Sequence, residues 1–562
     1  MSDRPISVSR LWPPVRSDKE QVHGSTFDLL ESLGFVRRTA ATGAFTLLTL
    51  GLRVRDVLAD ITRDSFERSG FNAISFPALQ SRSIWEESGR WQTYHDEGLL
   101  LRVEGRGGEE MCLAPTSEEI AVATVREDLR SYRDLPVRLF LSTNKYRSEI
   151  SPRGGLMRAQ EFEMADGYTF DDSPAGMTES VMLLNDSCRT ALQRMGLRGV
   201  FMSSADGGSI STGPSVEHLV LADFGQSDFL VCEYCGVRGD SAQLSGLFTA
   251  QADRVPTDEI VKVIVFTTGG GNTTPRVVSV VIRGDLRVSV RKLAAIVEDR
   301  RIDLVDRDTM VDLFDRAPGT LNPWDVVWVS DLVLFDQSVV GLDRFTMADG
   351  VDGLRSDMTW DGDHGFPPIS VSPADVHCAS TGLRCAACGH GRYRSIQAVE
   401  LGHVFELGNQ YSARMGIEFV DSAGDRQTPL MACSGIGITR CLQTIAGIHR
   451  DDQGLRWPVG VGPADVHVVA LRADQPDTHR RMVECADFLC GLGVRVLVDD
   501  RLAPAGDKFH YATALGIPFQ VVLSPQQSDD MVEVVDRWTG RRRMRSRREL
   551  SLADFGISHR GS

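Results

Sequence analysis

A charged pair near position 150 has a spacing suited to binding a phosphate and a base. Arg147 and Glu149 are separated by one residue, so on a strand both side chains would point to the same face. The guanidinium could hold a phosphate through two parallel hydrogen bonds, while the carboxylate accepts hydrogen bonds from a base or an amine. A surface ion pair has the same spacing, so the pair alone does not define a site.

Two further segments have residue types suited to ligand binding. Gly435 and Gly437 precede Arg440 at the start of an apolar helix, where glycine lets a ligand approach the backbone and arginine adds a fixed charge. Thr116 and Glu118 could present a hydroxyl and a carboxylate to an amino group. The alternative for these last two residues is ordinary capping at the start of a helix, with an acidic first turn.

Two cysteine pairs have the spacing of metal ligands. Cys232 with Cys235 and Cys385 with Cys388 are both C-x-x-C pairs, and each is followed by a glycine. Eleven cysteines in a long chain without a secretory signal indicate reduced thiols rather than disulfides. Four thiolates brought together could hold a closed structural zinc ion. The alternative is two unrelated pairs of free thiols.

A long amphipathic helix and several strands must position the first segments. Apolar residues recur at helical spacing from Leu52 to Phe66 and predict a helix. The segment 72–79 has strand character but contains Pro77, so we expect a strand at an edge or an interface. Strands are predicted at 137–143 and 161–170, joined by a loop rich in glycine and arginine.

The composition indicates several ordinary globular domains. The 562 residues are 42% apolar and 25% charged, and three or four domains fit this length. Residues from about 240 to 383 alternate β-rich runs, with strands predicted at 261–267 and 277–282, with polar loops. This change in sequence pattern predicts an inserted domain. The last segment alternates strands and helices, at 466–471, 479–492, 494–498, 507–515 and 519–523. This alternation predicts a small α/β domain around a mixed or parallel sheet.

Charge and hydropathy exclude some classes and leave others open. No stretch approaches the roughly 18 apolar residues of a membrane helix, and the first 19 residues lack a secretory signal. We therefore expect a cytoplasmic protein with no membrane partner. The net charge of −16 still allows nucleic-acid binding through local basic patches. One such patch is the arginine run 541–548, which could instead be a solvated basic strand edge.

Taken in order, these pieces resemble bacterial prolyl-tRNA synthetases, which are class II aminoacyl-tRNA synthetases. The resemblance also rests on the blocks Trp85-Glu86-Glu87-Ser88-Gly89-Arg90-Trp91, Gly402-His403-Val404-Phe405-Glu406-Leu407-Gly408 and Asp499-Asp500-Arg501. It implies an α+β multidomain fold, in which an antiparallel sheet flanked by helices carries an inserted α/β editing-like domain and a C-terminal α/β anticodon-binding domain. The implied boundaries are 1–240 and 384–462 for the catalytic domain, 241–383 for the insertion and 463–562 for the last domain.

The resemblance also implies a reaction and its partners. It implies a proline–tRNA ligase that uses ATP and Mg²⁺ to make prolyl-adenylate, transfers proline to tRNA(Pro), and works as a homodimer through the segment that includes Pro77. Arg147 would bind the α-phosphate, Glu149 would lie near the adenine, and Arg440 would hold the γ-phosphate end. The substrate pocket would be formed by Thr116, Glu118, Arg158, Cys433, Gly435 and Gly437.

Within the insertion, the resemblance implies an editing site that hydrolyses alanyl-tRNA. Lys262 matches the family's editing lysine, and the segment from Gly319 to Pro323 matches its G-x-x-x-P loop. The segment that includes Arg355 stands where the family has a histidine. We therefore expect weak or absent editing.

Several residues depart from the family pattern. Ser117 and Val216 replace histidines, while Gln160, Ala165, Gly167, Asn409 and Gln410 replace other usual residues. We expect these changes to cluster around the pocket, where the loss of a buried hydrogen-bonding partner costs about 1–3 kcal/mol. The alternatives are a paralogue with altered amino acid or inhibitor specificity, or a catalytically silent tRNA-binding or regulatory protein.

Overall fold

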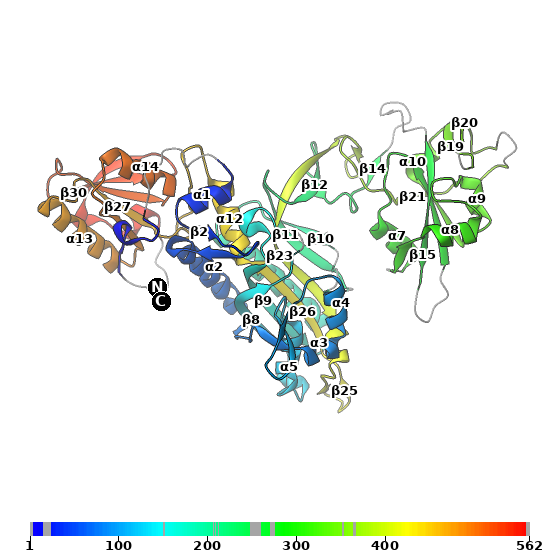
Figure 1. Ribbon diagram of the computed structural model, residues 1–562, viewed down its shortest axis with the longest axis horizontal. Coiled ribbons are helices and arrows are strands. Elements are labelled where there is room, and N and C mark those ends of the chain that lie inside the picture. Colours follow the sequence, from blue (N-terminus) through cyan, green and yellow to red (C-terminus); the bar gives the residue numbers. More distant parts are fainter. Residues whose placement is uncertain are drawn as a thin grey trace. The chain divides into compact units, whose positions relative to one another are not determined.

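The chain folds into two compact units, seen here in a computed structural model. Unit 1 comprises residues 1–220 with 399–562, and unit 2 comprises residues 221–398. The structure describes residues 4–557, except 15–23, 150–151, 206, 208–209, 212, 248–259, 270–275, 300, 351–352 and 363–366. In Figure 1, unit 2 is the part coloured from teal-green to yellow-green. It is wider at both ends than the insertion expected at 241–383.

The larger sheet of unit 1 is mostly antiparallel, as expected. Its main path runs in the order β10 (Phe201–Ala205), β11 (Ser215–Leu221), β23 (Tyr393–Gly408), β26 (Leu430–Gly437), β9 (Glu161–Asp171), β8 (Val137–Tyr146) and β4 (Asn72–Ala73). Strands β23, β26, β9 and β8 run antiparallel to one another in this order, and the short edge strand β4 is parallel to β8. The strands predicted at 137–143 and 161–170 are confirmed as β8 and β9.

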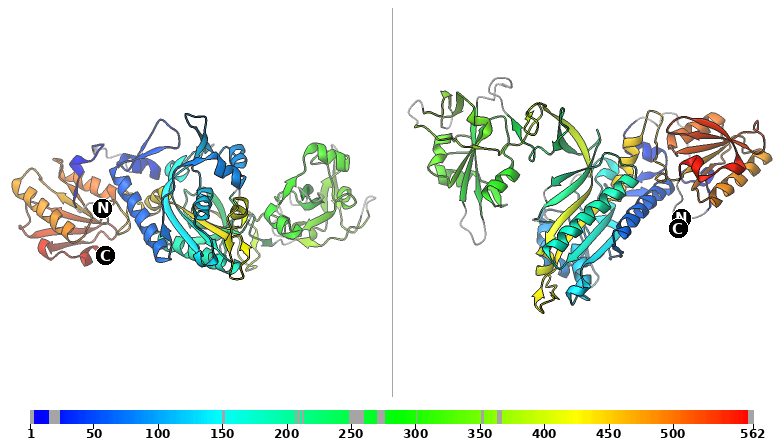
Figure 2. Two further views of the ribbon diagram at one scale, coloured as in Figure 1. Left: turned by 90° about the horizontal axis from the view of Figure 1, so that it is seen from below. Right: turned by 180° about the vertical axis from the view of Figure 1, so that it is seen from behind.

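Three helices cover one face of this sheet. They are α2 (Thr49–Arg68), α6 (Pro174–Arg194) and α12 (Ile438–His449), and they contact one another or the sheet strands. Figure 2 shows the long helices α2 and α6 side by side. Helix α2 confirms the helix predicted from Leu52 to Phe66, and its buried Val54, Val57 and Leu58 recur at helical spacing.

The strand predicted at 72–79 is only partly correct. Strand β4 ends at Ala73, and β5 (Leu79–Ser81) starts after Pro77. Proline has no N–H to donate to a sheet ladder, so the ladder is interrupted there. The expected edge position is confirmed, because β4 ends the path of the sheet.

Shorter elements complete this part of unit 1. The helices are α1 (Thr26–Ser32), α3 (Arg82–Ser88), α4 (Arg90–Asp96), α5 (Glu118–Arg126) and α11 (Gln410–Arg414). The short strands are β2 (Val36–Arg38), β3 (Phe45–Leu47), β6 (Leu101–Glu104), β7 (Glu110–Leu113), β24 (Phe419–Val420) and β25 (Arg426–Gln427). Helices α3, α5 and α11 contact one another and form a small helical layer.

The last part of unit 1 is the expected mixed α/β sheet. Its order is β1 (Ile6–Ser7), β28 (Val496–Asp499), β27 (Val466–Ala470), β29 (Phe519–Leu523), β30 (Met531–Asp536) and β31 (Arg542–Ser546), with helices α13 (Pro476–Gly491) and α14 (Ala505–Leu515). Strands β28, β27 and β29 are parallel, as βαβ connections require. The edge strand β1 comes from the other end of the chain and pairs in parallel with β28. Asp500 accepts hydrogen bonds from Ser7 and from both the N–H and the hydroxyl of Ser9.

Unit 2 contains its own sheet and several small apolar clusters. The order is β17 (Ile302–Leu304), β15 (Val261–Thr268), β16 (Arg276–Arg283), β18 (Leu332–Asp336) and β21 (Pro373–Ala374). The helices are α7 (Val290–Val297), α8 (Arg307–Phe314), α9 (Pro323–Val327) and α10 (Gln337–Val340). The short strands are β12 (Ser227–Cys232), β13 (Arg238–Gly239), β14 (Gly246–Leu247), β19 (Phe345–Ala348), β20 (Leu354–Met358) and β22 (Arg384–Cys385). Within the described residues of the whole chain, no helix is both long and apolar enough to span a bilayer.

Candidate active site

A pocket in unit 1 gathers all nine residues predicted for activation. The cavity measures about 160 Å³ and is lined by residues of β9, β23, β26 and α12 and by the segments before α5 and after β8. The predicted residues that line it are Thr116, Glu118, Arg147, Glu149, Arg158, Cys433, Gly435, Gly437 and Arg440. Residues up to 324 positions apart in sequence therefore meet in one site, although their individual roles stay predictions.

Arg147 and Glu149 reach the pocket in a different way from the one expected. Strand β8 ends at Tyr146, so the two residues lie on the loop that follows and not on a shared strand face. Arg147 donates from Nε to the Pro115 carbonyl at 3.1 Å, and its guanidinium lies 5.4 Å from the Phe162 ring centroid. Glu149 pairs with Arg158 at 2.7 Å. Loop contacts rather than strand alternation orient this pair.

Buried charges hold the carboxylate end of the pocket. Arg90 donates to Glu119 at 2.9 Å and lies 3.4 Å from Glu118, and all three side chains are buried. Burial alone would raise the pKa of Glu118, but Arg90 and the Thr116 hydroxyl outweigh it and lower that pKa. Burial dominates at Glu119 and raises its pKa. Glu118 is therefore the ionised carboxylate that lines the pocket and can attract an ammonium group.

The capping alternative for Thr116 is wrong. The residue before α5 is Ser117, and it makes no side-chain cap hydrogen bond. The Thr116 hydroxyl instead donates to the Glu118 carboxylate. The Thr116 side chain is thereby oriented for the pocket rather than used as a cap, while Glu118 both lines the pocket and forms, with Glu119, the expected acidic first turn of α5.

A second buried network lies beneath this end of the pocket. Lys145, fully buried, contacts the Asp166 carboxylate and the Ser117 hydroxyl at 2.5 Å each. Tyr168 donates to Asp166 at 3.2 Å and accepts from the Ser117 N–H at 3.0 Å. Burial raises the pKa of Asp166, while Lys145 opposes that rise. Ser117, one of the departures from the family pattern, is fully integrated in this network.

Cys433 does not have the properties of a nucleophile. Its thiol donates to Glu118 at 3.5 Å. Burial and the Glu118 charge raise the pKa of Cys433 well above the usual value. Since the thiolate is the reactive form, this cysteine acts as a small apolar wall of the pocket.

Another part of the pocket is lined by Arg440, which also lies 3.5 Å from the Glu400 carboxylate. Arg440 donates to the Met157 carbonyl at 3.0 Å and to the Glu400 carbonyl at 2.8 Å. A side chain at Gly435 would place its Cβ 2.9 Å from the Met164 sulfur, so glycine keeps this wall open. These contacts fix Arg440 beside a glycine-lined surface that a phosphate could approach.

Two carboxylates in this region could hold a divalent cation. Burial would raise the pKa of Glu400, but a hydrogen bond from His403 and the charges of Arg440 and Arg147 lower it to about 2. His403 lies 3.3 Å from Glu400 and 3.9 Å from Glu217. Ligand atoms of all three side chains lie within 4.8 Å of one another. Ionised carboxylate oxygens are the donors that Mg²⁺ prefers.

None of the departures from the family pattern lines the pocket itself, but Ser117, Gln160 and Gln410 contact residues that line or support it. On β9, Met164 and Asp166 line the pocket, and Ala165 and Gly167 alternate with them and face the other way. A Cβ at Gly167 would lie 2.7 Å from Leu184 of α6 and 2.8 Å from Phe66 of α2.

The remaining departures divide in the same way. Val216 lines a separate hollow with Met182 and Met202. Gln410, in contrast, donates to the carbonyl of Ile210 at 2.6 Å, and Ile210 lines the pocket. Ser117 and Gln160 also touch this region. The Gln160 side chain donates to the Glu149 carbonyl at 3.3 Å.

The predicted editing residues lie in unit 2. Lys262 is on β15, is partly buried, and donates to the Gly284 carbonyl at 2.8 Å. Burial lowers the pKa of Lys262, while Asp285 opposes that effect. Gly319 has a φ of +84°, and Pro323 is the first residue of α9. Val265 of β15 and Leu321 of the loop share one apolar cluster, so the strand and the loop pack together.

The structure also places the two predicted C-x-x-C pairs and the arginine run 541–548. All four cysteines of the C-x-x-C pairs meet in unit 2, with each Sγ within 4.8 Å of the others.

The arginine run 541–548 forms the edge strand β31 and the turn after it. Several of its arginines pair with acids: Arg542 with Glu533, Arg545 with Asp554, Arg547 with Glu484 and Arg548 with Asp530. The basic strand edge is therefore confirmed, while RNA contact stays a prediction.

Sequence reasoning missed several charged residues that line the pocket or support it from behind. Arg90, Glu119, Lys145, Asp166 and Glu400 were not predicted, although each is paired with a site residue or its neighbour. Arg90 lies in the Trp85–Trp91 block, so that motif contained a usable signal. Lys145 is separated from Arg147 by one residue, but nothing in the sequence indicates that it is fully buried.

Comparison with known proteins identifies the class first. The model "tRNA synthetase class II core domain (G, H, P, S and T)" matches residues 101–449, and "Anticodon binding domain" matches residues 465–553. These matches, with the antiparallel sheet and its pocket, define a class II aminoacyl-tRNA synthetase. The proline–tRNA ligase of Desulfovibrio desulfuricans is 32% identical over 97% of this chain and 96% of its own length. That of Fervidobacterium nodosum is 32% identical over 90% of both chains. The chain belongs to the proline–tRNA ligase family.

A solved structure supports the fold. The chain resembles the crystal structure of prolyl-tRNA synthetase from Cryptosporidium parvum complexed with L-proline and AMP, with a TM-score of 0.56. The match covers 93% of this chain and 72% of that one at 13% identity. At this identity the likeness concerns the fold alone.

Proposed function

We propose that this protein is an active proline–tRNA ligase, which activates proline with ATP and transfers it to tRNA(Pro). The observation that carries the proposal is the charge arrangement of one pocket. Ionised Glu118 lies at one end, and Arg147 and Arg440 line the same cavity. A zwitterionic amino acid and a triphosphate need this arrangement, with a carboxylate for the amine and guanidinium groups for the phosphates.

The chemistry needs positioning and charge neutralisation rather than a protein nucleophile. The proline amine would bind Glu118 and Thr116, which leaves the proline carboxylate free to attack the α-phosphorus. A bond forms between the carboxylate oxygen and phosphorus, and pyrophosphate leaves. Arg147 and Arg440 would neutralise the charge on the phosphates during this step.

Transfer to tRNA then breaks the mixed anhydride. A hydroxyl of the terminal ribose attacks the prolyl carbonyl, and AMP leaves with the electron pair of the broken bond. The C-terminal domain, residues 463–562 in our expectation, would bind the anticodon region. We also propose a homodimer that uses the segment containing Pro77, and a cytoplasmic location.

The proposal includes two metal ions, Mg²⁺ beside the pocket and zinc at the cysteine pairs of unit 2. Glu217 and Glu400 would hold Mg²⁺, which would supply positive charge near the phosphates of ATP. The donor set fits, since the pKa of Glu400 is lowered to about 2 and its carboxylate is ionised at neutral pH. Zinc would be structural, because its predicted cysteines are in unit 2 and do not line the pocket.

The positions of the departures support proline over an altered substrate. Ala165, Gly167 and Val216 do not line the pocket, so the changes at these positions do not alter contacts with a bound amino acid. Thr116, Glu118 and Arg147 remain in it. A silent tRNA-binding protein would have no physical need for these buried and matched charges.

Pyrophosphate exchange with the full-length protein tests the proposal. The twenty amino acids and proline analogues would be compared at equal concentration. We expect exchange with proline well above all other natural amino acids. Exchange with a different amino acid would indicate a paralogue of altered specificity, and no exchange with intact tRNA binding would indicate a silent tRNA-binding protein.

A further inference from the structure

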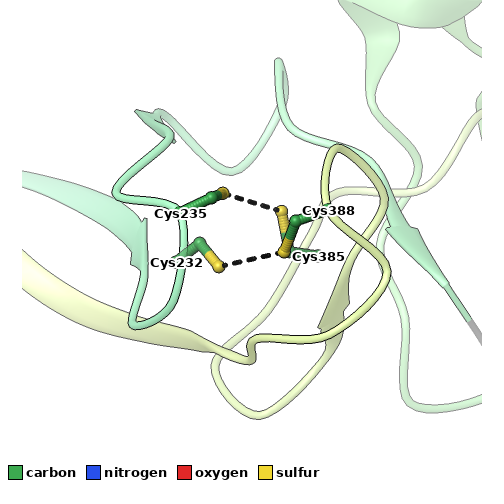
Figure 3. Close-up of side chains that lie close together, drawn as sticks. All are labelled: Cys232, Cys235, Cys385 and Cys388. Atoms are coloured by element: carbon green, nitrogen blue, oxygen red, sulfur yellow. Dashed lines mark hydrogen bonds between the residues drawn. The ribbon is translucent and has the colours of Figure 1, made fainter.

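Four cysteines from two distant segments meet at one point in unit 2. Cys232 ends β12 and Cys235 lies in the turn after it, whereas Cys385 ends the short strand β22 and Cys388 lies in the turn after that strand, about 150 residues later in the chain. Figure 3 shows the two pairs facing each other, with all four sulfurs turned inward. The Sγ atoms of Cys232 and Cys388 are 3.7 Å apart, and those of Cys235 and Cys385 are 3.9 Å apart.

We propose that these four thiolates bind one structural zinc ion, which fastens the two segments together. In a tetrahedral site with Zn–S bonds of 2.3 Å, the sulfurs are about 3.8 Å apart. Both measured separations agree with this spacing. A disulfide is excluded in this arrangement, because bonded sulfurs would be about 2.05 Å apart and all four cysteines are free.

The backbone around each pair has the same turn. The N–H of Gly236 donates to the Cys232 carbonyl at 3.0 Å, and the N–H of Gly389 donates to the Cys385 carbonyl at 2.8 Å. Both glycines have positive φ, +73° and +67°, which other residues rarely adopt. The two segments therefore form matching tight turns, each presenting two sulfurs to the same point.

Further contacts orient the sulfurs and close the site. The Gly391 N–H donates to the Cys388 sulfur at 3.4 Å, and the Val237 N–H donates to Cys235. A side chain at Gly391 would place its Cβ 2.5 Å from the Cys232 sulfur, so only glycine fits there. Backbone donors to ligand atoms are typical of a metal site, whose outer contacts fix the direction of the ligands.

The site is structural because all four positions around the ion are taken. Four cysteines leave no open position for water or substrate, unlike a catalytic zinc site. The apolar cluster next to it is small, with buried Leu230, Ala379, Leu383 and Tyr393 beside the cysteines. So small a core supplies little stability by itself, and metal binding can supply what is missing.

Metal analysis of the full-length protein tests this proposal independently of aminoacylation. The protein would be purified without chelator and without a histidine tag, and its metals measured by mass spectrometry. We expect about one zinc ion per chain, lost in Cys235→Ser and in Cys388→Ser. The matched control is Cys378→Ser, since Cys378 is a partly exposed thiol of unit 2 outside the cluster.

A measurement on the unchanged chain guards against variants that fail to fold. Iodoacetamide labelling, read by mass spectrometry, would compare the zinc-loaded protein with protein treated with a chelator. We expect zinc to protect Cys235 and Cys388 and to leave the labelling of Cys378 unchanged. Absence of zinc, equal loss of zinc in Cys378→Ser, another metal in its place, or labelling of Cys235 that ignores the chelator would each overturn the proposal.

Discussion

The pocket of unit 1 and the predicted editing site of unit 2 use charged residues in opposite ways. In unit 1, Arg90 and Lys145 are buried against carboxylates directly behind the substrate-binding residues. In unit 2, Lys262 donates to a backbone carbonyl, and the Gly319–Pro323 segment is a turn that leads into α9. Arg355, where the family has a histidine, pairs with Asp349 at 2.7 Å.

This difference indicates how tightly each site is fixed. A buried ion pair is strongly destabilising to break, so the carboxylates behind the activation pocket have few alternative positions. A partly exposed lysine bonded to a carbonyl is held by one weak contact. We therefore expect large effects from substitutions in unit 1 and small effects from substitutions at Lys262.

The largest expected effect is at Arg440, which lines the pocket. Arg440→Ala removes a fixed charge near the phosphates, and removal of one such group lowers the rate of the chemical step about 10²–10³-fold. Pyrophosphate exchange with proline measures the loss. Arg426→Ala is the matched control, because Arg426 is exposed and pairs with Glu418 away from the pocket-lining residues. A loss no larger in Arg440→Ala than in this control would contradict the role of Arg440.

The next effect compares buried arginines in the two units. Arg90→Met leaves Glu118 and Glu119 without their shared cation, and we expect the free energy of unfolding to fall by about 3–5 kcal/mol. Arg283→Met in unit 2 breaks a two-bond pair with Asp285, whose carboxylate is partly exposed, and should cost less, because water can hydrate that carboxylate once the arginine is gone. Urea unfolding of the full-length variants measures both. Equal losses of unfolding free energy in the two variants would contradict the expected difference between unit 1 and unit 2.

A third prediction concerns pH and unit 1. Burial lowers the pKa of His467 to about 4, and neither ring nitrogen has a hydrogen-bond partner among the described residues. An unfolded histidine has a pKa near 6.5, so between pH 6.5 and 4 the unfolded chain takes up a proton that the folded chain does not. We expect unit 1 to lose up to about 3 kcal/mol of stability as the pH falls through this range.

Substitution separates this histidine from the many carboxylates that also titrate. His467→Leu should flatten part of the pH dependence of urea unfolding between pH 6.5 and 4. His479→Gln, at an exposed position of α13, should leave it unchanged. An unchanged slope in His467→Leu would show that another group is responsible.

The smallest expected effect is in unit 2. Lys262→Ala should change the deacylation of alanyl-tRNA by less than about twofold, because loss of a single weakly held contact has little effect. Hydrolysis of preformed alanyl-tRNA by the full-length protein measures this. The matched control is Arg344→Ala, an exposed cation of the same unit. The prediction would be contradicted if the unchanged protein deacylated alanyl-tRNA rapidly and Lys262→Ala abolished this activity. Unit 2 would then contain a working editing site.

The sequence predicts regular elements well where apolar spacing or strand alternation is strong. Helix α2 and strands β8, β9, β15, β16 and β29 lie at the predicted positions within a few residues, because burial of one face imposes a clear period. The predicted strand around Pro77 is wrong in its second half, since proline interrupts the ladder there.

The motif residues predicted for the site do line one pocket, but the spacing of these residues in the sequence does not predict the orientation of their side chains. Arg147 and Glu149 reach the pocket from a loop, and Thr116 serves Glu118 instead of a helix end. The supporting residues Arg90 and Lys145 depend on contacts between segments far apart in sequence. No local pattern distinguishes a buried lysine from an exposed one.

The pairing of β1 with β28 has a consequence for the order in which the protein matures. Strand β1 is made nearly 500 residues before β28. Until then β1 has no sheet to join, and the finished C-terminal sheet exposes the edge of β28 until β1 arrives. An exposed edge can pair with another chain. A bulky group attached next to β1 would therefore disturb a sheet whose other strands lie more than 450 residues further along the chain.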